Sequence, residues 1–382
     1  MEIKGKEAPT NTQRTEIELR LEEIAHHSEI RGREIDGILN YIAFKSEASY
    51  LIVANGSGFK LVDKNKILYE RIPKIGFFHV DEAIYIKSCN CYFLAMNNKL
   101  YKKGINGQEP YLYMNLTVGS QAYHSIIYSE KLNRLIANIN FREIGLVNLR
   151  TRRLEVKLST KYFYESNPDE LCDLTLCGDM DQYVVTITSK GFLSAFELPS
   201  LSSTQLNDSY GKHFQELELS SEPMEQCLAV SSSAEENLVL ITTQSFEFGM
   251  SYASRFILMK INPEDGSLRQ IRSMKAGGWQ NRLFEPSIVS YLASISNKIY
   301  FIGIDCNKKA MTGQTRIDLL EFSPPEGEFR RRKAQCFELS LGLCYSMTKF
   351  RSEVLENLAE TFFAYLVNEN GRVIKLTGQS SL

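Results

Sequence analysis

A cassette of four short apolar segments recurs about seven times along this chain of 382 residues, and it constrains the fold more than any other feature. The second segment of each copy is the most apolar and is the easiest to align. These second segments are residues 50–54, 92–96, 134–138, 183–187, 238–242, 299–303 and 362–366. Repeats of roughly 40 residues that each contain four short strands are typical of β-propellers. The pattern predicts the architecture, but propellers serve both as binding modules and as enzymes, so it does not identify a function.

The last cassette lacks a fourth strand of its own. It offers strands at residues 344–349, 362–367 and 373–376, and no alternating segment follows them. Near the other end of the sequence, residues 15–22 alternate strictly, with Ile17, Leu19 and Leu21 on one face. A period of two predicts a half-buried strand, so we expect this segment to complete the last blade and close the ring. A helix over residues 15–30 is the competing interpretation.

The sequence therefore predicts an all-β fold, a seven-bladed β-propeller of four-stranded antiparallel blades with an N-terminal strand closing the last blade. A single domain would cover residues 15–378, between a flexible tail at 1–14 and a C-terminal tail at 379–382. This layout resembles the WD-repeat-like seven-bladed propeller superfamily, although the Gly-His and Trp-Asp dipeptides of that superfamily are absent. The resemblance implies a rigid disc that other proteins bind, and it implies no catalytic residues.

Composition excludes several classes of protein. The formal net charge of −2 provides no global field that would attract nucleic acid or an anionic membrane. The first ten residues are polar, and no apolar run approaches the length of a spanning helix, so we expect an intracellular protein, cytoplasmic or alternatively nuclear. The eight cysteines form no CxxC pair and no zinc set, and we expect them to be small buried side chains.

Expanded loops on one face of the disc carry the candidate partner-binding residues. Aromatic and arginine side chains on loops above a rigid scaffold are typical of binding hot spots. The candidates are Tyr162, Tyr164, Phe246, Phe248, Tyr252, Trp279, Arg282 and Phe284. The alternative is that these side chains only pack their own loops onto the disc.

The opposite face carries a helix expected at residues 352–360 and two basic clusters expected at turns between the third and fourth strands. The clusters are Arg150, Arg152 and Arg153, and Arg330, Arg331, Arg332 and Lys333. They could bind phosphate or act as a nuclear signal. Neighbouring glutamates and the near-zero net charge argue against nucleic acid as a partner.

No catalytic motif emerges from the sequence. There is no GxSxG, phosphate-loop, HExxH or EF-hand pattern, and the adjacent His26 and His27 would need two distant ligands to bind a metal. We therefore predict a non-enzymatic scaffold for protein–protein interaction within a larger complex, with no cofactor and no metal. The alternative is an enzyme or a small-ligand binder whose site lies at the central channel.

Overall fold

The computed structural model describes most of the chain as short strands. The residues it describes are 16–27, 40–46, 48–54, 58–64, 66–71, 80–96, 98–116, 125–138, 143–159, 171–178, 181–188, 191–198, 209–210, 213–216, 225–233, 237–247, 250–262, 264–275, 286–295, 298–305, 315–337, 344–347, 361–368 and 371–381. Among these residues, the 3-10 turn η1 (Lys87–Cys89) is the one helical element.

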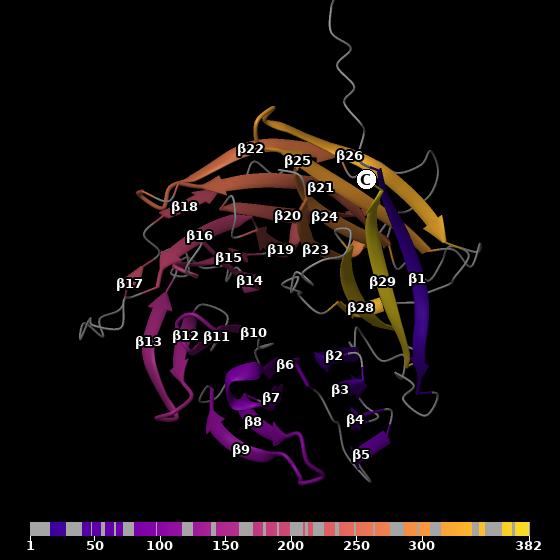
Figure 1. Ribbon diagram of the computed structural model, residues 1–382. Helices are drawn as coiled ribbons and strands as arrows, with labels where there is room; N and C mark the ends of the chain where they lie inside the picture. The colour runs from indigo at the N-terminus through magenta and orange to yellow at the C-terminus, as the bar shows by residue number, and fades with distance from the viewer. Residues whose placement is uncertain are drawn as a thin grey trace, which may run out of the picture.

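The strands form seven sheets arranged around a central axis (Figure 1). Each sheet has four antiparallel strands stacked one beyond the other from the axis outward, and one sheet gains a fifth strand at its outer edge. The chain is a seven-bladed β-propeller. Each sheet is called a blade below, and each blade is numbered by its order in the sequence.

Blades one to four occupy the first half of the chain. Blade one contains β2 (Asn40–Ser46), β3 (Ser49–Ala54), β4 (Gly58–Asp63) and β5 (Lys66–Arg71). Blade two contains β6 (Glu82–Ile86), β7 (Cys91–Met96), β8 (Lys99–Gly104) and β9 (Tyr111–Asn115). Blade three contains β10 (Ile126–Ser129), β11 (Arg134–Asn138), β12 (Glu143–Asn148), β13 (Arg153–Ser159) and β17 (Ser209–Tyr210). Blade four contains β14 (Leu171–Cys177), β15 (Tyr183–Thr188), β16 (Phe192–Glu197) and β18 (His213–Glu216).

Blades five to seven complete the ring. Blade five contains β19 (Glu225–Ser233), β20 (Leu238–Glu247), β21 (Met250–Ile261) and β22 (Leu268–Lys275). Blade six contains β23 (Pro286–Ile295), β24 (Lys298–Asp305), β25 (Thr315–Ser323) and β26 (Glu328–Phe337). Blade seven contains β27 (Cys344–Met347), β28 (Thr361–Asn368), β29 (Arg372–Ser381) and β1 (Glu16–His26).

The N-terminal strand closes the ring, which confirms the strand and excludes the competing helix. β1 pairs antiparallel with β29 from Glu16 opposite Ser381 to His26 opposite Arg372. The two strands, indigo and yellow in Figure 1, lie side by side although they come from opposite ends of the sequence. The strand is longer than the expected residues 15–22. Residues 379–381, expected to be a tail, extend β29 because β1 supplies hydrogen-bonding partners for them.

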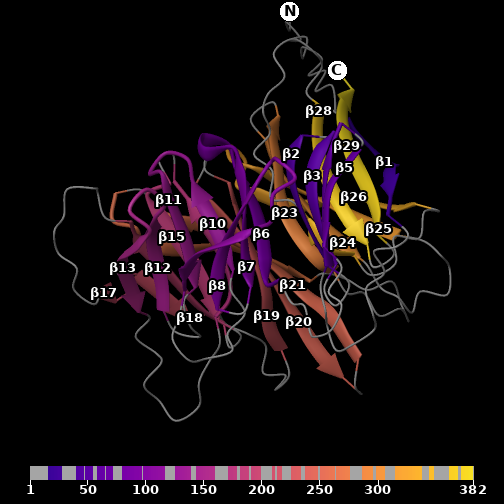
Figure 2. The same cartoon turned by 90° about the horizontal axis from the view of Figure 1, so that it is seen from below.

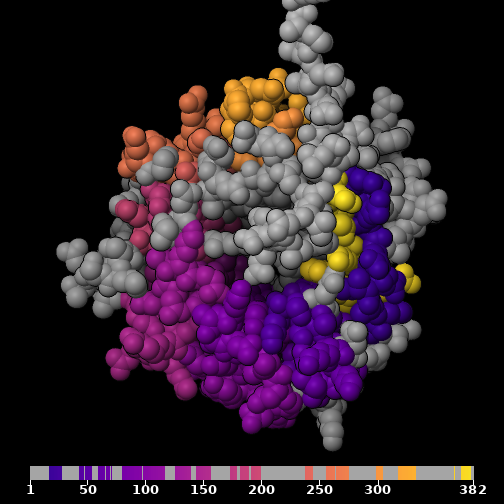
Figure 3. Space-filling view, in the orientation of Figure 1, coloured from indigo at the N-terminus to yellow at the C-terminus, as the bar shows by residue number. Residues whose placement is uncertain are grey.

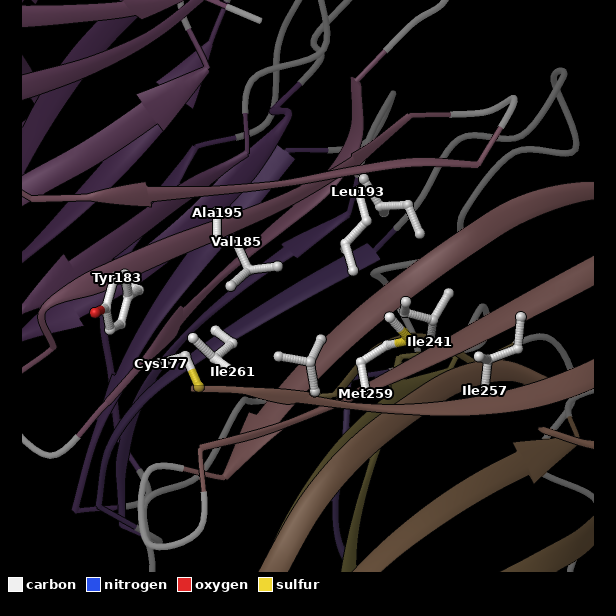
Figure 4. Packing of buried hydrophobic residues seen from close by; sticks show 11 residues of the cluster. Cys177, Tyr183, Val185, Leu193, Ala195, Ile241, Ile257, Met259 and Ile261 are labelled. Atoms are coloured by element: carbon white, nitrogen blue, oxygen red, sulfur yellow. The ribbon is translucent and has the colours of Figure 1, made fainter. Parts of the chain in front are cut away.

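The core lies between blades, where the second and third strands of one blade face those of the next. Every residue of β7 is buried, because both faces of this strand are covered by neighbouring blades. Figure 4 shows one such contact, in which Val185 and Leu193 of blade four face Ile261 and Met259 of blade five. Burial on both faces explains why the second segment of each cassette is almost continuously apolar.

The outer strands are irregular in a repeated way. In six blades, one residue of the outer strand is inserted opposite the third strand as a β-bulge. These inserted residues are Ile24, Leu68, Tyr113, Glu155, Ile271 and Arg332. A bulge increases local twist and redirects a side chain, so the repeat places one special position on the rim of each of these blades.

The segment 244–254 was expected to be a loop, and this prediction was wrong. β20 and β21 extend through the segment as a hairpin, in which Phe246 pairs with Ser251 and Ser245 pairs with Tyr252. Figure 2 shows this hairpin reaching past the neighbouring strands. The helix expected at residues 352–360 and the tail at 1–14 lie outside the described residues.

Candidate protein-binding surface

Four large apolar side chains are exposed on the rim of the disc. They are Ile67 and Leu68 in β5, exposed by 50% and 41%, and Tyr111 and Leu112 in β9, exposed by 46% and 47%. Among the residues whose side-chain exposure the structure describes, they are all of the large apolar side chains that are exposed, and they fall on the outer strands of two adjacent blades. We call these four residues the rim patch. The described residues of blades one and two form the indigo and violet surface at the bottom of Figure 3.

Leu68 is the bulge residue of blade one, and its environment differs from that of the other bulge residues. Tyr113 donates a hydrogen bond to the carbonyl oxygen of Leu149 in blade three. Glu155 accepts one from Arg134 at 2.6 Å, and Arg332 binds Glu321. These side chains therefore engage the propeller itself. Leu68 instead presents apolar surface to solvent, and exposed apolar surface of this kind is typical of a site that another molecule covers.

The backbone joins the two strands of the patch. A Cβ atom at Gly107, in the hairpin between β8 and β9, would lie 3.1 Å from the carbonyl oxygen of Leu68. Only a glycine permits so close an approach of the hairpin to β5 without displacement of one or the other. The patch on β5 and the hairpin that leads into β9 are thus held in a fixed relation.

The outer edge of a blade can accept a further strand, as blade three demonstrates. β17 pairs in parallel with β13, with Ser209 opposite Leu158 and Tyr210 opposite Ser159. β5 and β9 are the last strands of their sheets. Their unpaired backbone groups could add a strand from another protein in the same manner.

The rim patch has positive charge beside it where β5 begins. Lys64 and Lys66, at the turn into β5, are exposed. Asp63 between the strands accepts a hydrogen bond from Ser49, and Glu70 is bound to Lys60 at 2.9 Å. The two exposed lysines therefore favour acidic groups in whatever covers Ile67 and Leu68.

The partner-binding residues predicted from the sequence lie mostly outside the described residues. Those are Tyr162, Tyr164, Phe248, Trp279, Arg282 and Phe284. Phe246 and Tyr252 lie in the β20–β21 hairpin, one pair apart along its ladder. Their role in binding stays a prediction.

Sequence reasoning missed the rim patch, although a signal for it was present. Outer strands alternate, so adjacent apolar residues place at least one side chain away from the core. Ile67 is followed by Leu68 and Tyr111 by Leu112, which breaks the alternation in two outer strands.

The second basic cluster is part of an ion-pair network and not a turn. Arg330 to Lys333 lie within β26, where the buried Glu321 is bound by Arg332 and lies 3.2 Å from Arg330 and 3.5 Å from Lys298. Burial alone would raise the pKa of Glu321, but the hydrogen bonds and charges of these cations hold it below its ordinary value. Arg331 pairs with Asp318 at 3.3 Å. Because acidic groups neutralise these cations, the cluster is poorly suited to binding phosphate.

The first basic cluster lies at a turn, as expected. The turn between β12 and β13 contains Arg152 with a positive φ of 57°. The guanidinium of Arg152 lies 5.0 Å from the ring centre of Tyr113 in blade two. This contact gives Arg152 a role in joining blades two and three.

The first and second strands of blades three and four line a shallow recess that encloses essentially no space for a bound molecule. Its lining residues are Ser125, Asn138, Asp173, Leu174 and Thr186. Typical ligand pockets are larger, about 300–1,000 Å³. Its amide and carboxylate groups are also engaged internally, because Asn138 accepts a hydrogen bond from the backbone N–H of Ser125 and Asp173 accepts one from that of Leu174. Within the described part of the chain, no three His, Cys, Asp or Glu side chains gather in a metal-binding arrangement.

No helix in the described portion is long and apolar enough to cross a bilayer. Comparison of the sequence with models of known families and with curated proteins gives no match. The fold does match solved structures. One is the β-propeller domain of Nup133 from Vanderwaltozyma polyspora, with a TM-score of 0.58 and 11% identity over 90% of this chain and 93% of that chain. Another is the computationally designed protein Ika8, with a TM-score of 0.46 and 12% identity over 93% and 100%. At such low identity the likeness to the Nup133 domain concerns the fold alone.

Proposed function

We propose that this propeller is a non-enzymatic interaction platform, a subunit of a larger intracellular assembly, and that it binds a partner protein through the rim patch. The observation that carries the proposal is the confinement of the exposed large apolar side chains, among the described residues, to the outer strands of blades one and two. The repeat layout further supports placing the chain among WD-repeat-like propellers. A propeller domain of similar fold from Nup133 is compatible with this role.

The partner we propose presents an extended segment with apolar side chains and a nearby acidic group. The apolar side chains would cover Leu68 and Leu112, and the acidic group would face Lys64 and Lys66. An extended segment fits because β5 is an edge strand whose backbone can pair with it, as β13 pairs with β17. Burial of the patch supplies affinity, and the lysines supply orientation.

The test begins with purification of the full-length chain from its native cell and identification of stoichiometric partners by mass spectrometry. Capture of a partner does not by itself support the rim patch. Affinity is then measured by calorimetry for Ile67→Ser with Leu112→Ser, and for Lys64→Glu with Lys66→Glu. We expect the dissociation constant to rise about tenfold or more for each pair, as for loss of a hot spot.

Two controls make the outcome specific. Glu22→Ser changes an exposed residue of the outer strand of blade seven, and Lys131→Glu reverses an exposed lysine on blade three. Both should bind normally. If the patch variants bind normally while Trp279→Ala or Arg282→Ala abolishes binding, the partner uses the loop face predicted from the sequence and the rim proposal is wrong.

A further inference from the structure

Two cysteine thiols meet at a tight turn between β6 and β7. The Sγ atoms of Cys89 and Cys91 are 3.0 Å apart. Asn90 between them adopts a positive φ of 48°, and its backbone N–H donates to the carbonyl oxygen of Lys87 at 3.1 Å. Its side-chain oxygen accepts a hydrogen bond of 2.7 Å from Tyr85. The left-handed residue brings both thiols to the same side of the turn, and the two hydrogen bonds hold it there.

The two thiols are not equivalent. Cys89 is exposed, whereas Cys91 is 2% exposed as the first residue of β7. The sequence predicted that all eight cysteines are small buried side chains. The exposed position of Cys89 shows that this prediction was wrong for Cys89. A hydrogen bond from the Cys91 thiol lowers the pKa of Cys89 to about 7, against the effect of burial and with help from the charge of Lys102. The same contact, together with burial, raises the pKa of Cys91.

Other charged and titratable groups surround the pair. Glu130 opposes ionisation of Cys89, and Tyr85 and Tyr128 lie close by. The hydroxyl groups of Ser88 and Tyr128 are 2.8 Å apart, which links the turn to blade three. A nucleophilic thiolate is favoured by an exposed position, a hydrogen-bond donor and a nearby cation, and Cys89 has all three.

We propose that Cys89 and Cys91 form a thiol–disulfide exchange site in which Cys89 attacks a low-molecular-weight disulfide and Cys91 resolves the product. In the first step the Cys89 thiolate attacks one sulfur of the disulfide, forms a mixed disulfide and releases one thiolate. The charge on Cys89 then disappears, and the Cys91 thiol no longer donates to it. In the second step Cys91 loses its proton to solvent and attacks the Cys89 sulfur. The Cys89–Cys91 bond forms, the second small thiolate leaves, and both small thiolates take up protons. Two protein thiols have been oxidised by two electrons, and one disulfide has been reduced to two thiols.

The probe is oxidised glutathione added to the reduced full-length chain under native conditions. Both cysteines fall in one tryptic peptide, residues 88–99. In the wild type this peptide should become lighter by about 2 Da, the loss of two hydrogen atoms in an internal disulfide. Cys91→Ser should instead accumulate a stable glutathione adduct on Cys89, and Cys89→Ser should show neither product.

The buried Cys177 serves as an internal control and should remain unmodified. The rate of alkylation of Cys89 by iodoacetamide should rise with a midpoint near pH 7, and Lys102→Met should move that midpoint upward. The proposal fails if the wild-type peptide keeps both thiols, or if it retains a glutathione adduct that Cys91 does not release. It also fails if Cys177 reacts as readily as Cys89, because reaction would then report general unfolding.

Discussion

The Nε2 atom of His27 lies 2.9 Å from the hydroxyl oxygen of Tyr50. His27 directly follows the closing strand β1, and Tyr50 lies in β3 of blade one, so this contact ties blade seven to blade one. Tyr50 is 2% exposed, and burial raises its pKa to about 12. The rings of Phe44 and Tyr365 stack across the same seam at 4.3 Å between centroids. The junction where the ring closes therefore has polar and aromatic contacts besides the strand pairing.

Tyr50→Phe removes the hydroxyl group and keeps the ring. We expect a loss of about 0.5–1.5 kcal/mol in the free energy of unfolding, measured by urea denaturation, because a part-buried hydrogen bond is lost. His27→Ala should cost a similar amount, and the double variant should cost less than the two single variants added together. Tyr111→Phe, at an exposed position, should be neutral. Strictly additive losses would show that His27 and Tyr50 do not interact.

Leu19 tests the closing strand itself. It is 2% exposed within β1, so Leu19→Ala should lower the free energy of unfolding by about 2–4 kcal/mol through lost burial and a cavity. Arg20→Ala, on the exposed face of the same strand, should change it by less than about 0.5 kcal/mol. Deletion of residues 1–24 should leave β29 as an unpaired edge and promote association, visible by size-exclusion chromatography. A deletion variant that stays monomeric and melts normally would contradict the role of β1.

Because the pKa of Glu321 is lowered in the folded state, we expect the free energy of unfolding to decrease in acid. Its folded-state pKa lies below the ordinary carboxylate value of 4.5, so its stabilisation is fully present above that value. As the pH falls through the lowered folded-state pKa, this stabilisation should disappear. Glu321→Gln should cost about 3–5 kcal/mol at pH 7, because Arg332 and its neighbours lose a buried partner. The difference from wild type, followed by urea denaturation, should shrink on acidification. Glu328→Gln, at a more exposed position, is the control, and a constant difference at all pH values would refute the assignment.

The buried Lys103 should give a dependence of the same sign, stability rising with pH, but in the alkaline range. It is fully buried, its Nζ atom donates to the carbonyl oxygens of Gly104 and Asn106, and burial lowers its pKa to about 8. Between pH 8 and the ordinary lysine pKa of 10.5 the unfolded chain binds this proton more tightly, so stability should rise with pH. The rise attributable to Lys103 should be on the order of 1–3 kcal/mol, obtained as the difference from Lys103→Met. Parallel curves for the two proteins would contradict a lowered pKa.

Much of the fold was predictable because the repeated strands are buried on both faces. The strand β11 (Arg134–Asn138) was predicted with its observed bounds, and β15 (Tyr183–Thr188) to within one residue. The alternation of Ile17, Leu19 and Leu21 predicted ring closure, since only a sheet gives that period a buried face. The hairpin of β20 and β21 was missed because its far end has polar and aromatic residues without a clear period.

The binding surface was less accessible to sequence reasoning. The contacts between blades exist only once the ring has closed. The exposure of Leu68 depends on a β-bulge, and no residue type in β5 predicts that bulge. The proximity of Cys89 and Cys91 likewise depends on the left-handed conformation of Asn90. By contrast, the adjacent apolar residues of β5 and β9 were visible in the sequence and are a usable signal in similar chains.

The pairing of β1 with β29 also orders events during synthesis. β1 is the first strand of the ring to be synthesised, yet its partner β29 is the last. The earlier blades can assemble one after another while β1 waits without a sheet to join. An interrupted translation product would therefore carry an unmatched, alternating strand at its start and an open blade at its end. Because both are open sheet edges, the propeller has no closed ring until β29 has been made and has paired with β1.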